Sequence, residues 1–244
     1  MQLKTAWLLA LLALGACGGP ADPTGAVDPA AEAPAAERDP LEPELVATDA
    51  AGAPTTGRFE LGVHYLRLSP TQPTSSNPDQ VEVAEVFWYG CPHCNELDPL
   101  LERWRERTPD YVSFVRVPAV WNSRLVVHAR AFYTAEALGK GAEMHTAFFR
   151  EIHENDNGLD TEPKLQEFFG RFGVDAVAFK TAFDSFAVQA KLQRADELSR
   201  RYRIGSVPTI IVNGKYTTDG PMAGSYDELL DLVDELTAAE REAR

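Results

Sequence analysis

The stretch VFWYGCPHC, residues 86–94, decides the fold predicted for this chain. It completes a run from Val81 to Tyr89 that is β-branched and aromatic, and apolar on both alternating faces except for Glu82 and Glu85. Such a run is typical of a central strand covered on both sides. A helical pattern follows from the cysteines to about Thr108. The sequence therefore predicts a strand that leads directly into a helix, with two cysteines at the junction.

The flanking sequence predicts one sheet with a helical insertion at about residues 122–203. Tyr111 to Val120 is expected to be a second core strand, which completes a βαβ unit with a right-handed crossover. The other expected elements are an edge strand at Phe59 to Leu68, helices at Ser123 to Leu138, Met144 to Asn155, Lys164 to Phe172, Asp175 to Asp184 and Ala187 to Arg203, a hairpin at Pro208 to Tyr216 turning at Asn213-Gly214, and a final helix at Ser225 to Ala239. The predicted class is α/β.

Composition restricts the class of function. The chain has 244 residues, of which 44% are apolar and 25% charged, values ordinary for a soluble globular protein. Its formal net charge is −14. A nucleic-acid binder needs a basic surface to release phosphate counterions, so that class is excluded.

The N-terminus has the pattern of an export signal. Lys4 precedes an apolar run from Ala6 to Leu14, which small residues and Cys17 follow. The run is too short to span a bilayer as a helix, and no other stretch approaches a membrane span. Residues 14–17, LGAC, resemble the bacterial lipobox, in which the cysteine is lipidated. The alternative is a plain signal peptide with an unmodified Cys17.

Residues 18–57 are rich in Pro, Ala and acidic side chains and contain no aromatic residue. Such a segment buries too little apolar area to offset its ordering entropy, so we expect a flexible tether. The domain organisation expected is a signal at 1–17, a disordered tether at 18–57 and a folded domain at 58–244.

Cys91 and Cys94 are the two cysteines outside the signal, and a pair at this spacing has four interpretations. A zinc site normally needs a second pair of ligands, and no histidine shows that spacing. A haem attachment needs a histidine directly after Cys94, where Asn95 stands. A purely structural bridge would close a very small loop and add little stability. A redox-active pair is favoured.

The position of the pair at a helix start supports redox chemistry. The first N–H groups of a helix are unpaired and its dipole is positive there, which favours a thiolate at Cys91. Pro92 suits the first helical turn. His93 can add a positive charge or a hydrogen bond, or be a solvated loop histidine. Stabilising the thiolate stabilises the reduced form and makes the disulfide a strong oxidant.

Residues 86–94, together with VPTIIVNGKY at 207–216, resemble the DsbA family of bacterial thiol:disulfide oxidoreductases. The resemblance extends from about Phe59 to the C-terminus. It implies a thioredoxin fold with an inserted helical domain, and a catalytic disulfide that needs neither cofactor nor metal.

The resemblance also implies roles for further residues. Val207-Pro208 matches the family's cis-proline site, which faces the disulfide and, with Pro92, contacts substrate. Glu85 matches a buried acid that exchanges a proton with the buried Cys94, although a solvent-facing Glu85 is the alternative. The family's basic partner on the next strand has no clear lysine here, and Arg116 is the nearest cation.

The partners implied are reduced or unfolded exported proteins and a quinone-linked membrane oxidase of the DsbB type. We expect a periplasmic monomer, tethered to a membrane by a lipid on Cys17 alone, with the tract from Trp121 to Val127 shaping a groove for unfolded chains. Two alternatives remain open at this point. One is a disulfide isomerase or reductase of the same superfamily, and the other is a tethered binding or chaperone module.

Overall fold

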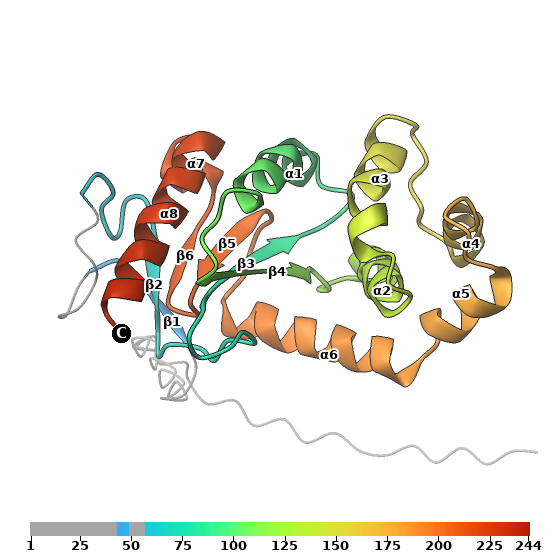
Figure 1. Cartoon of the computed structure of the whole chain (residues 1–244), viewed down its shortest axis with the longest axis horizontal. Coiled ribbons are helices and arrows are strands. Elements are labelled where there is room, and N and C mark those ends of the chain that lie inside the picture. Colours follow the sequence, from blue (N-terminus) through green and yellow to red (C-terminus); the bar gives the residue numbers. More distant parts are fainter. Residues whose placement is uncertain (1–42, 49–56) are drawn as a thin grey trace, which may run out of the picture. The chain divides into compact units, whose positions relative to one another are not determined.

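The computed structural model describes residues 43–48 and 57–244 of the chain. This part of the chain contains a six-stranded sheet with the order β1-β2-β6-β5-β3-β4 (Figure 1). The strands are β1 (Glu44–Val46), β2 (Leu66–Ser69), β3 (Val81–Phe87), β4 (Val112–Pro118), β5 (Thr209–Val212) and β6 (Tyr216–Thr218).

Strand β3 lies between β5 and β4, and each of its residues is buried. It is antiparallel to β5 and parallel to β4. Successive side chains of a strand point to opposite faces. Accordingly Val83 lies in one hydrophobic core, whereas Ala84 and Val86 lie in another. The predicted central strand is confirmed, and it separates two cores.

Helix α1 (Pro92–Arg105) connects β3 to β4 and packs with α8 (Tyr226–Glu242) in one of these cores. Leu97 and Trp104 supply apolar surface from α1, and the Trp104 indole N–H donates to Asp234 of α8 at 2.7 Å. The predicted β-α-β unit is confirmed. Strand β4 differs from the expectation in one respect, because it ends the described strand order and is not flanked on both sides.

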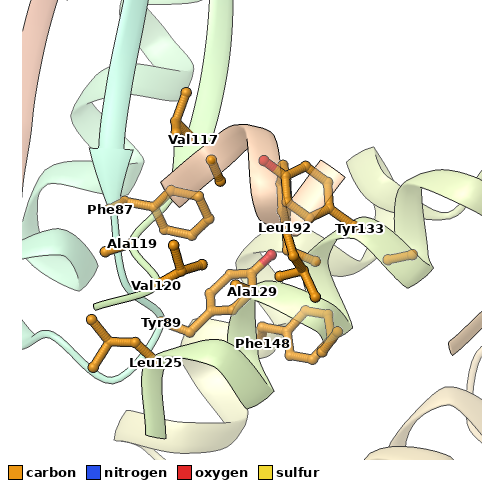
Figure 2. Close-up of a cluster of buried hydrophobic side chains, with 14 of the residues drawn as sticks. Phe87, Tyr89, Val117, Ala119, Val120, Leu125, Ala129, Tyr133, Phe148 and Leu192 are labelled. Atoms are coloured by element: carbon orange, nitrogen blue, oxygen red, sulfur yellow. The ribbon is translucent and has the colours of Figure 1, made fainter. Parts of the chain in front are cut away.

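The predicted helical insertion follows β4. It consists of α2 (Ser123–Ala137), α3 (Gly141–His153), α4 (Glu162–Gly170), α5 (Ala176–Phe183) and α6 (Phe186–Arg201). The insertion packs on the end of β3 through aromatic side chains. Tyr89 stacks on Phe148 of α3 with ring centroids 4.6 Å apart, and Phe87 meets Phe132 of α2 edge to face (Figure 2 shows Phe87, Tyr89 and Phe148). The α/β class with inserted helices is thus confirmed.

The predicted hairpin joins β5 to β6. Asn213 and Gly214 have φ of 52° and 63°, and the Lys215 N–H donates to the Val212 carbonyl at 2.9 Å. A β-carbon at Gly214 would lie 2.1 Å from the Gln72 carbonyl oxygen. The turn therefore needs glycine both for its left-handed backbone and for close approach of another segment.

Two expectations about the start of the domain are wrong. Glu44–Val46 is a strand, paired antiparallel with β2, although composition placed it in a disordered tether at 18–57. The backbone hydrogen bonds with β2 hold this segment in the sheet, and composition alone does not predict such pairing. The strand expected at Phe59 to Leu68 is limited to Leu66–Ser69, because a turn closed by the His64 N–H on the Glu60 carbonyl precedes it.

One short helix, α7 (Gly220–Ala223), was not predicted. The Asp219 carboxylate caps it by accepting the Met222 N–H at 2.8 Å. The predicted signal at 1–17, which includes Cys17, and residues 18–42 and 49–56 of the expected tether lie outside the described residues. No helix of the described residues is long and apolar enough to cross a lipid bilayer.

Candidate active site

Cys91 lies at the N-cap of α1, between the end of β3 and the first turn of the helix. Its thiol is not bridged to Cys94 in this structure. The pKa of Cys91 is lowered to about 6, chiefly by a hydrogen bond from the Cys94 thiol. The backbone N–H groups of Cys94 and His93 and the charge of His93 lower it further, whereas burial opposes them. At neutral pH Cys91 is therefore a thiolate.

Cys94, one helical turn further, has no exposed surface. Burial raises its pKa well above the ordinary thiol value, and the hydrogen bond to Cys91 and the charges of Glu85 and Cys91 act in the same direction. The pair is therefore asymmetric. The outer sulfur is a stabilised anion and the inner sulfur keeps its proton.

Pro92 and His93 form the exposed surface of the motif. Pro92 occupies the first turn of α1, where its missing N–H leaves no helical hydrogen bond unmade. The His93 ring is solvated and lies 3.3 Å from Glu96, and the His93 carbonyl accepts the Tyr226 hydroxyl at 3.2 Å. The sequence did not indicate Tyr226, which reaches the motif from the last helix of the chain.

The loop before β5 brings Val207 to the reactive sulfur. The Val207–Pro208 peptide bond is cis, the geometry that the resemblance implied. The Val207 carbonyl oxygen lies 3.4 Å from the Cys91 sulfur, and Pro208 is buried. Residues that are 116 positions apart in sequence therefore share one face of the site.

Glu85 is buried, with a relative exposure of 1%, so the solvent-facing alternative is excluded. Its partner in the register of β3 and β4 is Arg116, whose Nε lies 3.1 Å from the Glu85 carboxylate. Burial raises the pKa of Glu85 to about 7, with help from the charges of Asp98 and Glu102, although Arg116 lowers it. Arg116 is thus the cation beside Glu85.

Arg116 also contacts two α1 carboxylates that the sequence reading missed. It lies 3.4 Å from Asp98 and 2.5 Å from Glu102. Asp98 and Glu102 follow Cys94 at intervals of four residues, so all three share one face of α1. The sequence shows this spacing, but it does not show which cation the two carboxylates contact. The register of β3 and β4 places Arg116 against the same face of α1.

Three histidines of the insertion hold the segment that leads to Cys91. The Tyr89 hydroxyl lies 2.9 Å from His145, which is itself 3.1 Å from Asp98. His153 hydrogen-bonds the Tyr89 carbonyl at 2.8 Å, and His128 stacks on Trp88. The helical insertion therefore fixes the backbone on the N-terminal side of the reactive cysteine.

Comparison with known proteins finds close relatives. The family described as DSBA-like thioredoxin domain matches residues 115–234. The chain is 38% identical over 186 residues to the thiol:disulfide interchange protein DsbA of Azotobacter vinelandii, covering 76% of this chain and 86% of that protein. It is 38% identical over 185 residues to the same-named protein of Pseudomonas aeruginosa, covering 76% and 87%.

Two solved structures are similar to this chain in both sequence and fold. The crystal structure of Pseudomonas aeruginosa DsbA is 39% identical, with a TM-score of 0.71, and covers 75% of this chain and 94% of that one. The oxidoreductase NmDsbA3 of Neisseria meningitidis is 28% identical, with a TM-score of 0.65, and covers 75% and 97%.

The raised pKa of Glu85 gives a prediction for the pH dependence of stability. Folding raises this pKa from 4.5 to about 7. This shift stabilises the folded protein fully below pH 4.5. As the pH rises through 7, the free energy of unfolding falls by on the order of 3 kcal/mol. In the oxidised protein, Glu85→Gln should remove this loss between pH 5 and 8. The difference between the free energies of unfolding at pH 5 and pH 8, from denaturant titrations, measures this loss.

Glu102→Gln is the control. Burial raises the pKa of Glu102, but the hydrogen bonds and charges of Arg116 and Arg105 together outweigh burial and lower it. This variant should leave most of the loss of stability above pH 5 in place, because the Glu102 charge is the smallest of the causes named for Glu85. The assignment is wrong if Glu85→Gln and the unmodified protein lose equal stability between pH 5 and 8.

Proposed function

Because the chain belongs to the DsbA family of thiol:disulfide interchange proteins, we propose that it donates its Cys91–Cys94 disulfide to exported proteins, with Cys91 as the reacting sulfur. The chain is a thiol:disulfide oxidoreductase with a thioredoxin-like fold. The observation that carries the proposal is the asymmetric placement of the pair. Cys91 lies at the N-cap of α1 and Cys94 is fully buried, which lowers the pKa of the first thiol and raises that of the second.

This asymmetry favours oxidation of the substrate. The hydrogen bonds at the Cys91 sulfur stabilise a thiolate, and a thiolate exists only in the reduced protein. Stabilising the reduced form raises the tendency of the disulfide to accept two electrons, a relation for which DsbA enzymes are themselves the best-known case. The same groups make Cys91 a good leaving group when the mixed disulfide is resolved.

The reaction has two exchange steps. A substrate thiolate attacks the Cys91 sulfur, the Cys91–Cys94 bond breaks, and Cys94 leaves with the electron pair and takes a proton. A second substrate thiolate then attacks the substrate sulfur of the mixed disulfide and releases Cys91 as a thiolate. The substrate dithiol has lost two electrons and two protons, and the protein dithiol has gained the electrons.

Glu85 is proposed as the proton donor to Cys94. Its pKa of about 7 leaves it protonated through mildly acidic pH, and its charge acts on the Cys94 sulfur. A carboxyl group with a pKa near the working pH both gives and recovers a proton readily. Arg116 supports this role because its charge limits how far burial raises the pKa of Glu85.

Substrate binding is proposed on both sides of Cys91. The Val207 carbonyl, 3.4 Å from the sulfur, can pair with an extended substrate strand, and Pro92 and His93 form the exposed rim. Trp121, 46% exposed, borders a cavity of about 460 Å³ that Ile204 also lines. These features support the proposed groove for unfolded chains.

Each turnover leaves Cys91 and Cys94 reduced, so a second protein must accept two electrons. We propose a quinone-linked membrane oxidase of the DsbB type for this step, and a monomeric enzyme in the periplasm. Interaction with substrate proteins follows from the family.

We also propose that residues 1–17 are a signal and that a lipid on Cys17 anchors the protein. The interval from Cys17 to β1 is shorter than the sequence suggested, because the sheet begins at Glu44.

The proposed function predicts the effects of cysteine substitutions. Cys91→Ser should lower the rate of oxidation of a reduced, unfolded protein by at least about 100-fold, because the Cys91–Cys94 disulfide that the substrate attacks cannot form. Cys94→Ser should accumulate mixed disulfides through Cys91. Cys17→Ser removes the third cysteine and should retain the full rate, which makes it the control. Substantial oxidation by Cys91→Ser would contradict the assignment.

The anchor has its own test. The unmodified protein should fractionate with membranes and carry a mass increase from acyl chains at Cys17. Cys17→Ser should move it to the fraction released by osmotic shock, with its oxidation rate unchanged. Wild-type protein found in the released fraction, without acyl chains, would disprove the anchor.

A further inference from the structure

Tyr226 joins the last helix of the chain to the catalytic motif. It is the first residue of α8, and its hydroxyl donates to the His93 carbonyl at 3.2 Å. The two residues are 133 positions apart. Among the described residues, this hydrogen bond ties α8 directly to the turn between Cys91 and Cys94.

The Tyr226 side chain is held in place from two sides. A β-carbon at Gly220 would lie 2.6 Å from the ring, so the glycine permits the ring to pack on the backbone of α7. The ring also packs against the core that α1 and α8 share. Burial, with the charges of Glu96 and both cysteines, raises the pKa of Tyr226 to about 12. The hydroxyl therefore remains a donor throughout the working range of pH.

The acceptor of this hydrogen bond belongs to a particular peptide group. The His93 carbonyl and the Cys94 N–H are the two ends of one amide, and that N–H lies in the first turn of α1, where it lowers the pKa of the Cys91 thiol. A carbonyl oxygen has two lone pairs, so it accepts the Tyr226 hydroxyl in addition to a helical N–H. Accepting a hydrogen bond at the oxygen polarises the amide and strengthens donation by its N–H, by about 10–30% per bond.

We propose that Tyr226 is a positioning residue for the reactive cysteine: by donating its hydroxyl to the His93 carbonyl, it strengthens the attraction of the Cys94 N–H, in the same peptide group, for the Cys91 thiolate at the helix N-cap. The inference rests on the proposed function, in which Cys91 is the attacked and the released sulfur. Tyr226 touches neither substrate nor sulfur in this role and acts through the backbone.

The strengthened attraction acts only on the thiolate, so it favours the reduced protein. Its loss should destabilise the Cys91 thiolate and make the disulfide a weaker oxidant. Polarisation of the peptide group changes the strength of one charge-assisted interaction by a modest fraction. We therefore expect a change of about two-fold in the acid dissociation constant of Cys91 and in the equilibrium constant with glutathione.

The experiment uses the full chain with Tyr226→Phe, which removes the hydroxyl and keeps the ring. We expect the pKa of Cys91, followed by thiolate absorbance, to rise by about 0.3. We expect the equilibrium with glutathione to shift about two-fold toward the oxidised protein. Tyr111→Phe is the matched control, because Tyr111 packs against the same core but touches no residue of the motif. It should change neither quantity.

A purely structural role makes a different prediction. In that case Tyr226→Phe and Tyr226→Leu would lower the free energy of unfolding and leave the Cys91 pKa and the glutathione equilibrium unchanged, which would overturn the proposal. A wild-type protein without a low-pKa thiol would instead disprove the function proposed for Cys91, and the role of Tyr226 with it. If the wild-type protein has a low-pKa Cys91 and the Tyr226→Phe variant has the same Cys91 pKa and the same glutathione equilibrium, only the role of Tyr226 is disproved.

Discussion

The hydrogen bond from the Cys94 thiol to the Cys91 sulfur, and the N–H groups of the first turn of α1 that assist it, are the interactions on which the site depends. They reach Cys91 because β3 ends at Phe87 and α1 begins at Pro92, five residues later, which leaves Cys91 at the N-cap. Unpaired N–H groups at a helix start favour a negative charge. That geometry, together with a buried Cys94, converts two identical side chains into a thiolate and a thiol.

The rest of the fold holds this junction in place. Each face of β3 lies in a different hydrophobic core, so the strand that delivers Cys91 is covered on both sides. The helical insertion fixes the segment before Cys91 through His145 and His153, and α8 reaches the segment after it through Tyr226. The helical insertion and the last helix therefore both contact the chain that flanks Cys91.

The sequence predicted what is local and missed what is tertiary. The strand, the cysteine pair at a helix start and the turn at Asn213-Gly214 were accessible, because spacing and residue type determine them. Strand β1 was missed, since its order comes from pairing with β2 and its composition is that of a tether. The contacts of Arg116 with Asp98 and Glu102 were missed, as was Tyr226, because register and helix packing, which a single sequence does not display, bring these residues together.

The central claim is that the fold stabilises the reduced pair, and the free energies of unfolding of the reduced and oxidised proteins test it most directly. Lowering the pKa of Cys91 to about 6 stabilises the folded dithiol above that pH, and the gain is lost as the pH falls through 6. We therefore expect the reduced protein to be the more stable form at pH 7 to 8, with an advantage that shrinks toward pH 5. A disulfide form that is more stable throughout this range would contradict the account.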